Sequence, residues 1–124
     1  MTRDDNYWAT DAAAAFMRAR LDELHATATA AKASLSGRWH ADSEGNLQDR
    51  DTGENAAHII INDPATVLAS VAADRMLLDA YYQAGSIAQP DPAESGYLDG
   101  IAHAIRCRAT AWAKHPDYRE EWRP

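Results

Sequence analysis

Histidines are the residues of this sequence best suited to metal chemistry, and three of the five fall in well-marked segments. These three are His40, His58 and His115. Neutral imidazole binds zinc and other divalent ions, often together with a carboxylate. However, no pair of these histidines has a local metal spacing such as His-x-x-x-His, so the three would have to converge from distant segments. Otherwise each donates to a backbone carbonyl or caps a helix, as His115 would at a helix end. We expect no cofactor and keep a zinc module or metal-dependent enzyme on these histidines as an alternative.

The single cysteine offers a second, weaker possibility. A lone Cys107 excludes an intrachain disulfide and any zinc motif with several cysteines. His103 lies four residues before it, and a histidine beside a thiolate lowers the pKa of the thiol. A cysteine on an alanine-rich helix is more often a small buried apolar residue, which is what we expect here. A nucleophile elbow, a phosphate loop and a dinucleotide fingerprint are all missing from the sequence. A protein without enzymatic activity is therefore the favoured prediction.

Aromatic and arginine side chains indicate protein binding. The chain has four tryptophans and five tyrosines, and each of these side chains can bury ~150–250 Å². They either form the core or supply an interface, where tryptophan, tyrosine and arginine concentrate binding energy. Both interpretations stay open, and they can hold for different residues. The candidate contact residues are Trp39, Tyr118, Arg119, Trp122 and Arg123.

The charge distribution excludes some partners. The net charge is −7, and residues 42–54 carry a net −4 of it. No basic face is available to meet phosphates, so nucleic acid is not an expected partner. An acidic protein that imitates nucleic acid and inhibits a host protein is a further alternative. The sequence shows neither an apolar membrane span nor the start of a signal peptide, so we expect a cytoplasmic protein with no membrane partner.

The composition predicts one mainly helical domain over residues 1–124. Alanine accounts for 27 residues, while leucine, isoleucine, valine and phenylalanine together supply 17. With only two valines, a sheet-based core is excluded. An alanine-rich seam buries little apolar area, and each Å² is worth only ~25 cal/mol. We therefore expect a homo-oligomer, in which a subunit interface supplies the missing burial.

Three long helices are expected to form the scaffold. The first covers residues 10–35, with Thr10 or Asp11 as its cap and a heptad-spaced seam. The second starts at Asp63-Pro64 and ends at Gly85. The third starts at Asp91-Pro92 with a capping box and runs to His115-Pro116. Its predicted buried stripe consists of Leu98, Ile101, Ala102, Ile105, Ala109 and Trp112. A short C-terminal helix follows, in which Tyr118 and Trp122 pair at i,i+4.

The remaining segments complete an α+β prediction, mainly α with a small β-hairpin. Turn clusters around Gly45 and Gly53 favour a hairpin over residues 37–54. Residues 1–9 are expected to be a flexible N-terminus, and residues 86–91 a linker between helices. Residues 55–62 are ambiguous, because three consecutive isoleucines favour a strand and an asparagine cap followed by alanines favours a helix.

Five segments in order carry a family resemblance. They are Phe16 to Glu23, Gly37-Arg38-Trp39-His40, Ala56-Ala57-His58-Ile59, Asp63-Pro64-Ala65 with Val67-Leu68, and His115-Pro116-Asp117-Tyr118-Arg119-Glu120-Glu121-Trp122-Arg123-Pro124. Across nearly its full length the chain resembles a family of small actinobacterial and actinophage proteins of unknown function. More loosely it is similar to the Ead-like early proteins of tailed phages. The second resemblance implies that residues 55–62 are helical, and the two together imply a phage, prophage or actinobacterial setting.

The resemblance also bears on the metal alternative. Many relatives have cysteines before the last long helix, whereas this chain has only Cys107, inside the helix pattern itself. If relatives hold zinc through those cysteines, we expect that this member does not. Our leading hypothesis is a non-enzymatic accessory protein of phage type that binds another protein.

Overall fold

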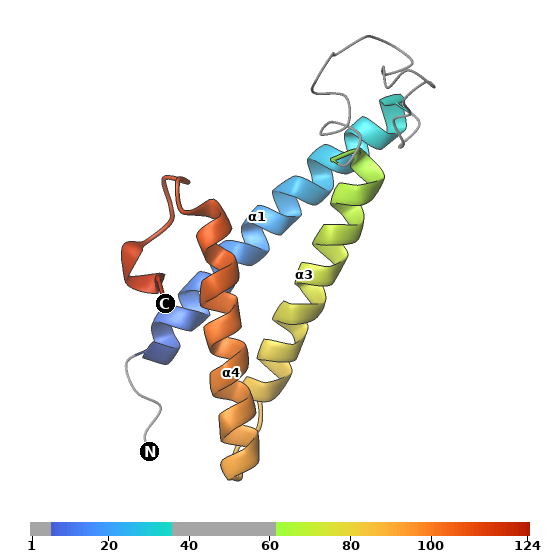
Figure 1. The fold of residues 1–124 in the computed structure, drawn as a ribbon. Helices are drawn as coiled ribbons and strands as arrows, with labels where there is room; N and C mark the ends of the chain where they lie inside the picture. The colour runs from blue at the N-terminus through green and yellow to red at the C-terminus, as the bar shows by residue number, and fades with distance from the viewer. Residues whose placement is uncertain (1–5, 36–61) are drawn as a thin grey trace, which may run out of the picture. The chain divides into compact units, whose positions relative to one another are not determined.

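The computed structural model describes residues 6–35 and 62–124. Three long helices dominate them: α1 (Asn6–Leu35), α3 (Pro64–Gly85) and α4 (Pro92–Ala109). Two short 3-10 helices follow, η2 (Thr110–Trp112) and η3 (Glu120–Trp122) (Figure 1). The prediction of three long helices is confirmed. None of the described helices is long and apolar enough to cross a membrane.

The α+β prediction was wrong. Residues 6–35 and 62–124 contain helices, turns and bends and no strand, so the fold is all-α over these ranges. The physical reason is the composition of these ranges, in which alanine, the best helix former, is abundant and β-branched residues are few. The hairpin was expected at residues 37–54, which lie outside the described residues, as do residues 55–61.

Local capping signals fix where α3 and α4 begin. The backbone N–H of Thr66 donates to Asp63 Oδ1 at 2.8 Å, so Asp63 caps α3. At α4 the N–H of Glu94 donates to Asp91 Oδ1 at 2.7 Å, and Glu94 Oε1 accepts from the Asp91 N–H at 3.1 Å. This reciprocal pair is the predicted capping box.

Other boundaries differ from the predictions. α1 begins at Asn6 rather than at residue 10, so Asp11 lies within the helix and accepts a hydrogen bond from the Tyr81 hydroxyl. α4 ends at Ala109 rather than near His115, and the Thr110 hydroxyl donates to the Cys107 carbonyl at 2.6 Å. That local bond competes with regular helix geometry. The C-terminal helix is the single 3-10 turn η3, which starts after Tyr118.

The chain divides into two compact units, Met1–Leu21 with Asp74–Pro124, and Asp22–Ala73. In the first unit the most buried apolar side chains come from α1 and α4. They include Ala13, Ala14, Met17, Leu21, Ile105 and Ala109. The predicted α4 stripe is confirmed at Leu98, Ala102, Ile105 and Ala109. In the second unit Ala28 and Val71 are buried. The expectation of one domain over residues 1–124 stays a prediction.

Candidate functional site: the C-terminal segment and the α3–α4 groove

The C-terminal segment, residues 113–124, is anchored by Trp122. This side chain is 3% exposed and packs in one apolar cluster with Ala9, Ala13 and Phe16 of α1 and Ala109 of α4. Figure 1 shows the end of the chain beside the N-terminal part of α1. Burying a tryptophan removes a large apolar area from water, so this contact holds the chain end against α1 and α4.

Ring contacts extend the cluster around Phe16. Its ring centroid lies 5.1 Å from that of Trp122, 6.0 Å from Tyr118 and 5.4 Å from His115. Tyr118 and Trp122 meet edge to face at 5.5 Å. Such geometries suit the ring quadrupoles and add to the area term. The pairing predicted between Tyr118 and Trp122 therefore exists, although the two residues do not share a helix.

Arg106 of α4 binds the backbone of the same segment. Its Nε donates to the Trp122 carbonyl at 2.9 Å, and its Nη2 donates to the carbonyls of Glu121 at 3.3 Å and Arg123 at 2.9 Å. A guanidinium is a rigid fork of N–H donors, which suits several closely spaced acceptors. Arg106 thus holds three consecutive carbonyls near the chain end.

His115 is occupied by protein groups on both ring nitrogens. Its Nδ1 accepts from the Asp117 N–H at 3.0 Å, and Arg20 Nη1 lies 3.1 Å from Nδ1 and 2.5 Å from Nε2. Arg20 Nη1 also lies 3.7 Å from Asp117 Oδ2. A guanidinium has only donors and a neutral imidazole has one acceptor nitrogen, so only one of the two Arg20 contacts can be a hydrogen bond, and Nδ1, which accepts from Asp117, is that acceptor. A metal ion at His115 would have to displace these contacts and sit beside a positive charge.

The three predicted metal ligands are not brought together by the described residues. His40 and His58 lie outside them, and residues 6–35 and 62–124 hold no group of three His, Cys, Asp or Glu side chains arranged to bind a metal. A metal site on these three histidines stays an alternative hypothesis.

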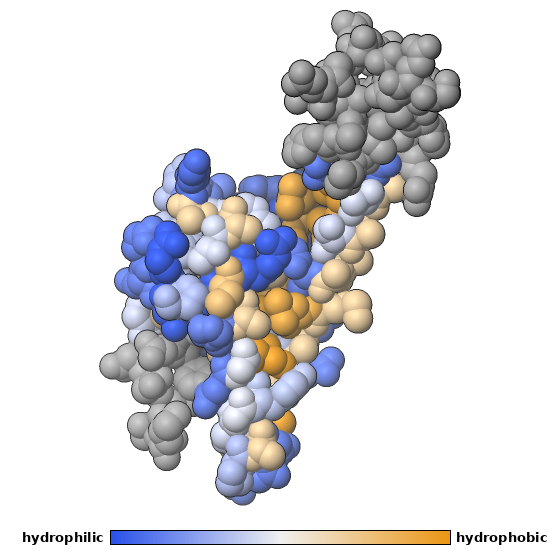
Figure 2. Space-filling model, viewed as in Figure 1, coloured by the Kyte–Doolittle hydropathy of each residue, from blue (hydrophilic) through white to orange (hydrophobic). Residues whose placement is uncertain are grey.

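The outer side of the C-terminal segment is polar (Figure 2). Arg119 and Arg123 are exposed and Tyr118 is half-buried, while Trp39, the fifth predicted contact, lies outside the described residues. Arg123 forms a two-bond ion pair with Glu120, at 2.9 and 3.1 Å, and lies over the Tyr118 ring at 5.9 Å. The hydrogen bond from Arg123 lowers the pKa of Glu120, and the bond to Glu120 raises the pKa of Arg123. Trp122 therefore anchors the C-terminal segment in the apolar cluster, and Arg119 and Arg123 form part of its exposed surface.

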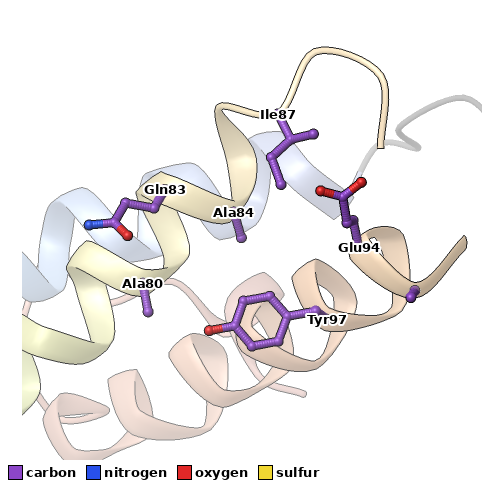
Figure 3. Close-up of a pocket in the computed structure, with 7 residues that line it drawn as sticks. Ala80, Gln83, Ala84, Ile87, Glu94 and Tyr97 are labelled. Carbon is purple, nitrogen blue, oxygen red and sulfur yellow. The ribbon is translucent and has the colours of Figure 1, made fainter. Parts of the chain in front are cut away.

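A second feature is an open groove of about 520 Å³ where α3 ends and α4 begins. It is lined by Ala80, Gln83, Ala84, Ile87, Ala93, Glu94 and Tyr97. Figure 3 shows Tyr97 across the groove from Ala80 and Ala84. Tyr97 is 58% exposed, and the only carboxylate among these seven residues, that of Glu94, serves the capping box. The groove offers an apolar surface without a pair of acid and base groups among its lining residues.

Two further residues of α4 are Arg108, which forms an ion pair within the chain, and Cys107, which is exposed. Arg108 donates to both carboxylate oxygens of Asp74, at 2.9 and 2.8 Å, and lies 5.1 Å from the Trp112 ring. The hydrogen bond to Asp74 raises the pKa of Arg108.

Cys107 is exposed, so the prediction that it is a buried apolar residue was wrong. The reason is its position on α4, because the stripe of buried residues lies on the opposite side of that helix.

The role of Arg106 and the groove were both missed by sequence reasoning. An arginine one turn from the end of a helix is usual, and nothing in its spacing indicates three backbone acceptors fifteen to seventeen residues later. Three of the seven residues that line the groove are alanines, and the lining residues come from both α3 and α4 and the segment between them. Among the residues that line the groove, only Tyr97, an aromatic side chain that is exposed, gives an indication of a binding surface.

One comparison with known proteins identifies a relationship. The model of a family of unknown function, DUF6221, matches residues 10–124. No curated protein and no solved structure matches the chain.

Proposed function

Because this chain belongs to the DUF6221 family, whose function is unknown, we propose its function from its own surfaces: it is a protein-binding module without enzymatic activity. The single observation behind this proposal is the C-terminal segment, which is held in place by Trp122 and Arg106 and leaves Arg119, Arg123 and part of Tyr118 exposed. The resemblance of its segments to actinophage proteins supports the finer proposal of a phage-type accessory protein in a bacterial cytoplasm.

Preorganisation supports binding at this segment. An irregular segment that is disordered in the free protein must become ordered when it binds a partner. The entropy lost in that ordering lowers the affinity. Here the ordering is done within the chain, by the buried indole and by three hydrogen bonds to backbone carbonyls. Functional residues are often placed in this way, on irregular segments held by a rigid scaffold.

The exposed side chains indicate the chemistry of the partner. Arg119 is exposed and lies between Tyr118 and Glu120 in the chain. A guanidinium prefers planar acceptors such as carboxylates, and tyrosine adds a rigid apolar surface. We propose that the partner presents a carboxylate to Arg119 and an apolar side chain to the exposed part of Tyr118.

A charge reversal tests this proposal without disturbing the anchor. The tagged protein, its Arg119→Glu variant and its Lys114→Glu variant are used to capture proteins from an actinobacterial lysate, which are then quantified by mass spectrometry. Lys114 is exposed on the same segment, so the second variant controls for a change of charge alone. We expect a protein captured by the wild type and by Lys114→Glu, whose binding in a titration of the purified pair weakens at least tenfold with Arg119→Glu. Equal capture by all three proteins, or no specific capture, contradicts the proposal.

A further inference from the structure

The C-terminal segment contacts the helices much as a separate peptide would. Backbone N–H groups of the segment donate to carbonyls three residues earlier in the chain, so this part of its hydrogen bonding is local. Its contacts with α1 and α4 are made by side chains and by backbone carbonyls: Trp122 packs on Phe16, and Arg106 binds three carbonyls. Peptides are commonly bound in this way, through an aromatic anchor in an apolar site and through hydrogen bonds to their backbone.

The surface that receives the segment is built from two helices. It supplies apolar side chains around the indole of Trp122, one guanidinium for backbone carbonyls and a second beside His115. Met17 and Ile105 are fully buried but lie outside this apolar cluster, so α1 and α4 also have buried residues that do not depend on Trp122. We refer to this surface as the docking site, and its residues are Ala9, Ala13, Phe16, Arg20, Arg106 and Ala109.

Two polar atoms of the segment oppose its docking. Trp122 Nε1 and the Tyr118 hydroxyl are buried and have no hydrogen-bond partner among the described residues. Both groups hydrogen-bond to water when the segment is free. A buried polar group that loses those bonds without a replacement reduces the free energy gained by burying the rings. The segment is therefore held less firmly than its buried indole alone suggests, and it can leave the docking site while the helices stay folded.

We propose that the docking site is a peptide-binding site, which the chain's own C-terminal segment occupies and which also accepts the same segment of a second copy. Residues 113–117 form turns and bends, so they serve as the hinge on which the segment opens. Exchange between copies replaces each contact by an identical one, so the occupant is set by the sequence that the site already fits. The contacts that carry this proposal do not include the Arg119 side chain, so it does not rest on the proposed function.

Competition with the tethered segment sets the expected affinities. A segment on a short tether has an effective concentration of about 1–10 mM at its own site. Closure favoured about hundredfold, which is close to the smallest usual cost of losing a buried tryptophan, then corresponds to a Kd of about 10–100 µM for the free peptide. In the wild type only the open fraction binds, so the apparent Kd rises about hundredfold.

Binding of a synthetic peptide to the full chain tests the proposal. A fluorescent peptide of residues 113–124 is titrated with the wild type, with Trp122→Ala and with Trp8→Ala, a control that removes an exposed tryptophan of α1. We expect Trp122→Ala to bind the peptide with a Kd of about 10–100 µM, and the other two chains to bind it at least tenfold more weakly. A Trp122→Ala chain that binds the peptide no better than the wild type overturns the proposal.

Two altered peptides test which side chain of the segment is recognised. The peptide with Trp122→Ala should lose binding to the Trp122→Ala chain. The peptide with Arg119→Glu should bind like the unaltered peptide, because the Arg119 side chain is exposed. Binding that is lost with Arg119→Glu but kept with Trp122→Ala would assign the contact to the exposed surface of the segment and overturn the proposal.

Native-state amide exchange of the wild type is a second measurement, and it does not require the Trp122→Ala chain to fold. The hydrogen-bonded amides of Tyr118, Trp122 and Arg123 should share one protection factor, at least tenfold below those of Ala13 and Ile105 in the helices. Equal protection of the segment and the helices would mean that the segment leaves its site only when the whole unit unfolds, which overturns the proposal.

Discussion

The C-terminal segment and the exposed side of α4 lie in the same compact unit, and they differ in how far the fold itself accounts for their residues. In the C-terminal segment, Trp122 fills an apolar cluster and Arg106 occupies three backbone carbonyls. On the exposed side of α4 that carries Gly96 and Gly100, a Cβ atom added at either glycine would meet no described atom within 4 Å. Trp122 and Arg106 thus have structural roles, whereas Gly96 and Gly100 have no packing role within the described residues.

This difference changes where binding energy should be sought. Tryptophan is the residue most enriched at interface hot spots, yet Trp122 is already buried in the first unit. While the segment is docked, the side chains available to a partner are its polar neighbours on the segment.

The largest expected effect is on the anchor. Replacing Trp122 by alanine removes the indole from the Phe16 cluster, and comparable core truncations cost about 3–5 kcal/mol. Urea denaturation should show this loss of unfolding free energy. Trp8→Ala is the control, because Trp8 is 58% exposed and its loss should cost less than about 1 kcal/mol. Equal effects of the two substitutions would contradict the structural role of Trp122.

The next effect concerns the contacts of Arg106. Arg106→Met keeps an apolar stem and removes three hydrogen bonds to carbonyls of the C-terminal segment. We expect a loss of about 1–3 kcal/mol, together with faster amide exchange at residues 121–123. Lys114→Met, which removes a charge from an exposed position, should change neither quantity. Unchanged exchange at residues 121–123 in Arg106→Met would show that Trp122 alone holds the segment.

The exposed side of α4 should respond in the opposite direction. Gly96→Ala and Gly100→Ala each place a methyl group in open space and should stabilise the fold by about 0.5–1 kcal/mol. Urea denaturation measures this gain. Destabilisation by either substitution would mean that another part of the chain covers this side of α4, and it would remove the contrast between the two surfaces.

The smallest effect is electrostatic. Arg123 lowers the pKa of Glu120 below its ordinary value of 4.5, so the folded chain favours the ionised carboxylate. This pair therefore stabilises the fold above pH 4.5 and loses its contribution as the pH falls through the folded pKa. A carbon-detected NMR titration should show Glu120 titrating at lower pH in the wild type than in Arg123→Ala. Identical titrations would contradict the ion pair.

The features that depend on neighbouring residues could be predicted from the sequence. The capping box of Asp91 and Glu94 and the buried stripe from Leu98 to Ala109 are both confirmed, because each depends on residues within a few turns of one helix. The helix starting at Asp63-Pro64 follows the same logic. These features depend on local sequence, so they can be predicted without knowledge of the tertiary structure.

The candidate site could not be predicted in the same way. Trp122 packs against Phe16, more than one hundred residues earlier, and no periodic pattern connects the two positions. Arg20 reaches His115 across a similar separation. Cys107 is exposed because it lies on the side of α4 opposite the buried stripe, which residue type alone does not reveal. Long-range packing decided each of these outcomes.

Chemical-shift mapping by NMR tests the docking site most directly. The unlabelled peptide of residues 113–124 is added to the isotope-labelled Trp122→Ala chain, and the wild-type spectrum serves as the reference. We predict that the amide signals of the docking site move toward their wild-type positions, while those of Gly96 and Gly100 on the exposed side of α4 stay unchanged. Movement of the two glycine signals instead, or no movement of any signal, would contradict binding of the segment at the docking site.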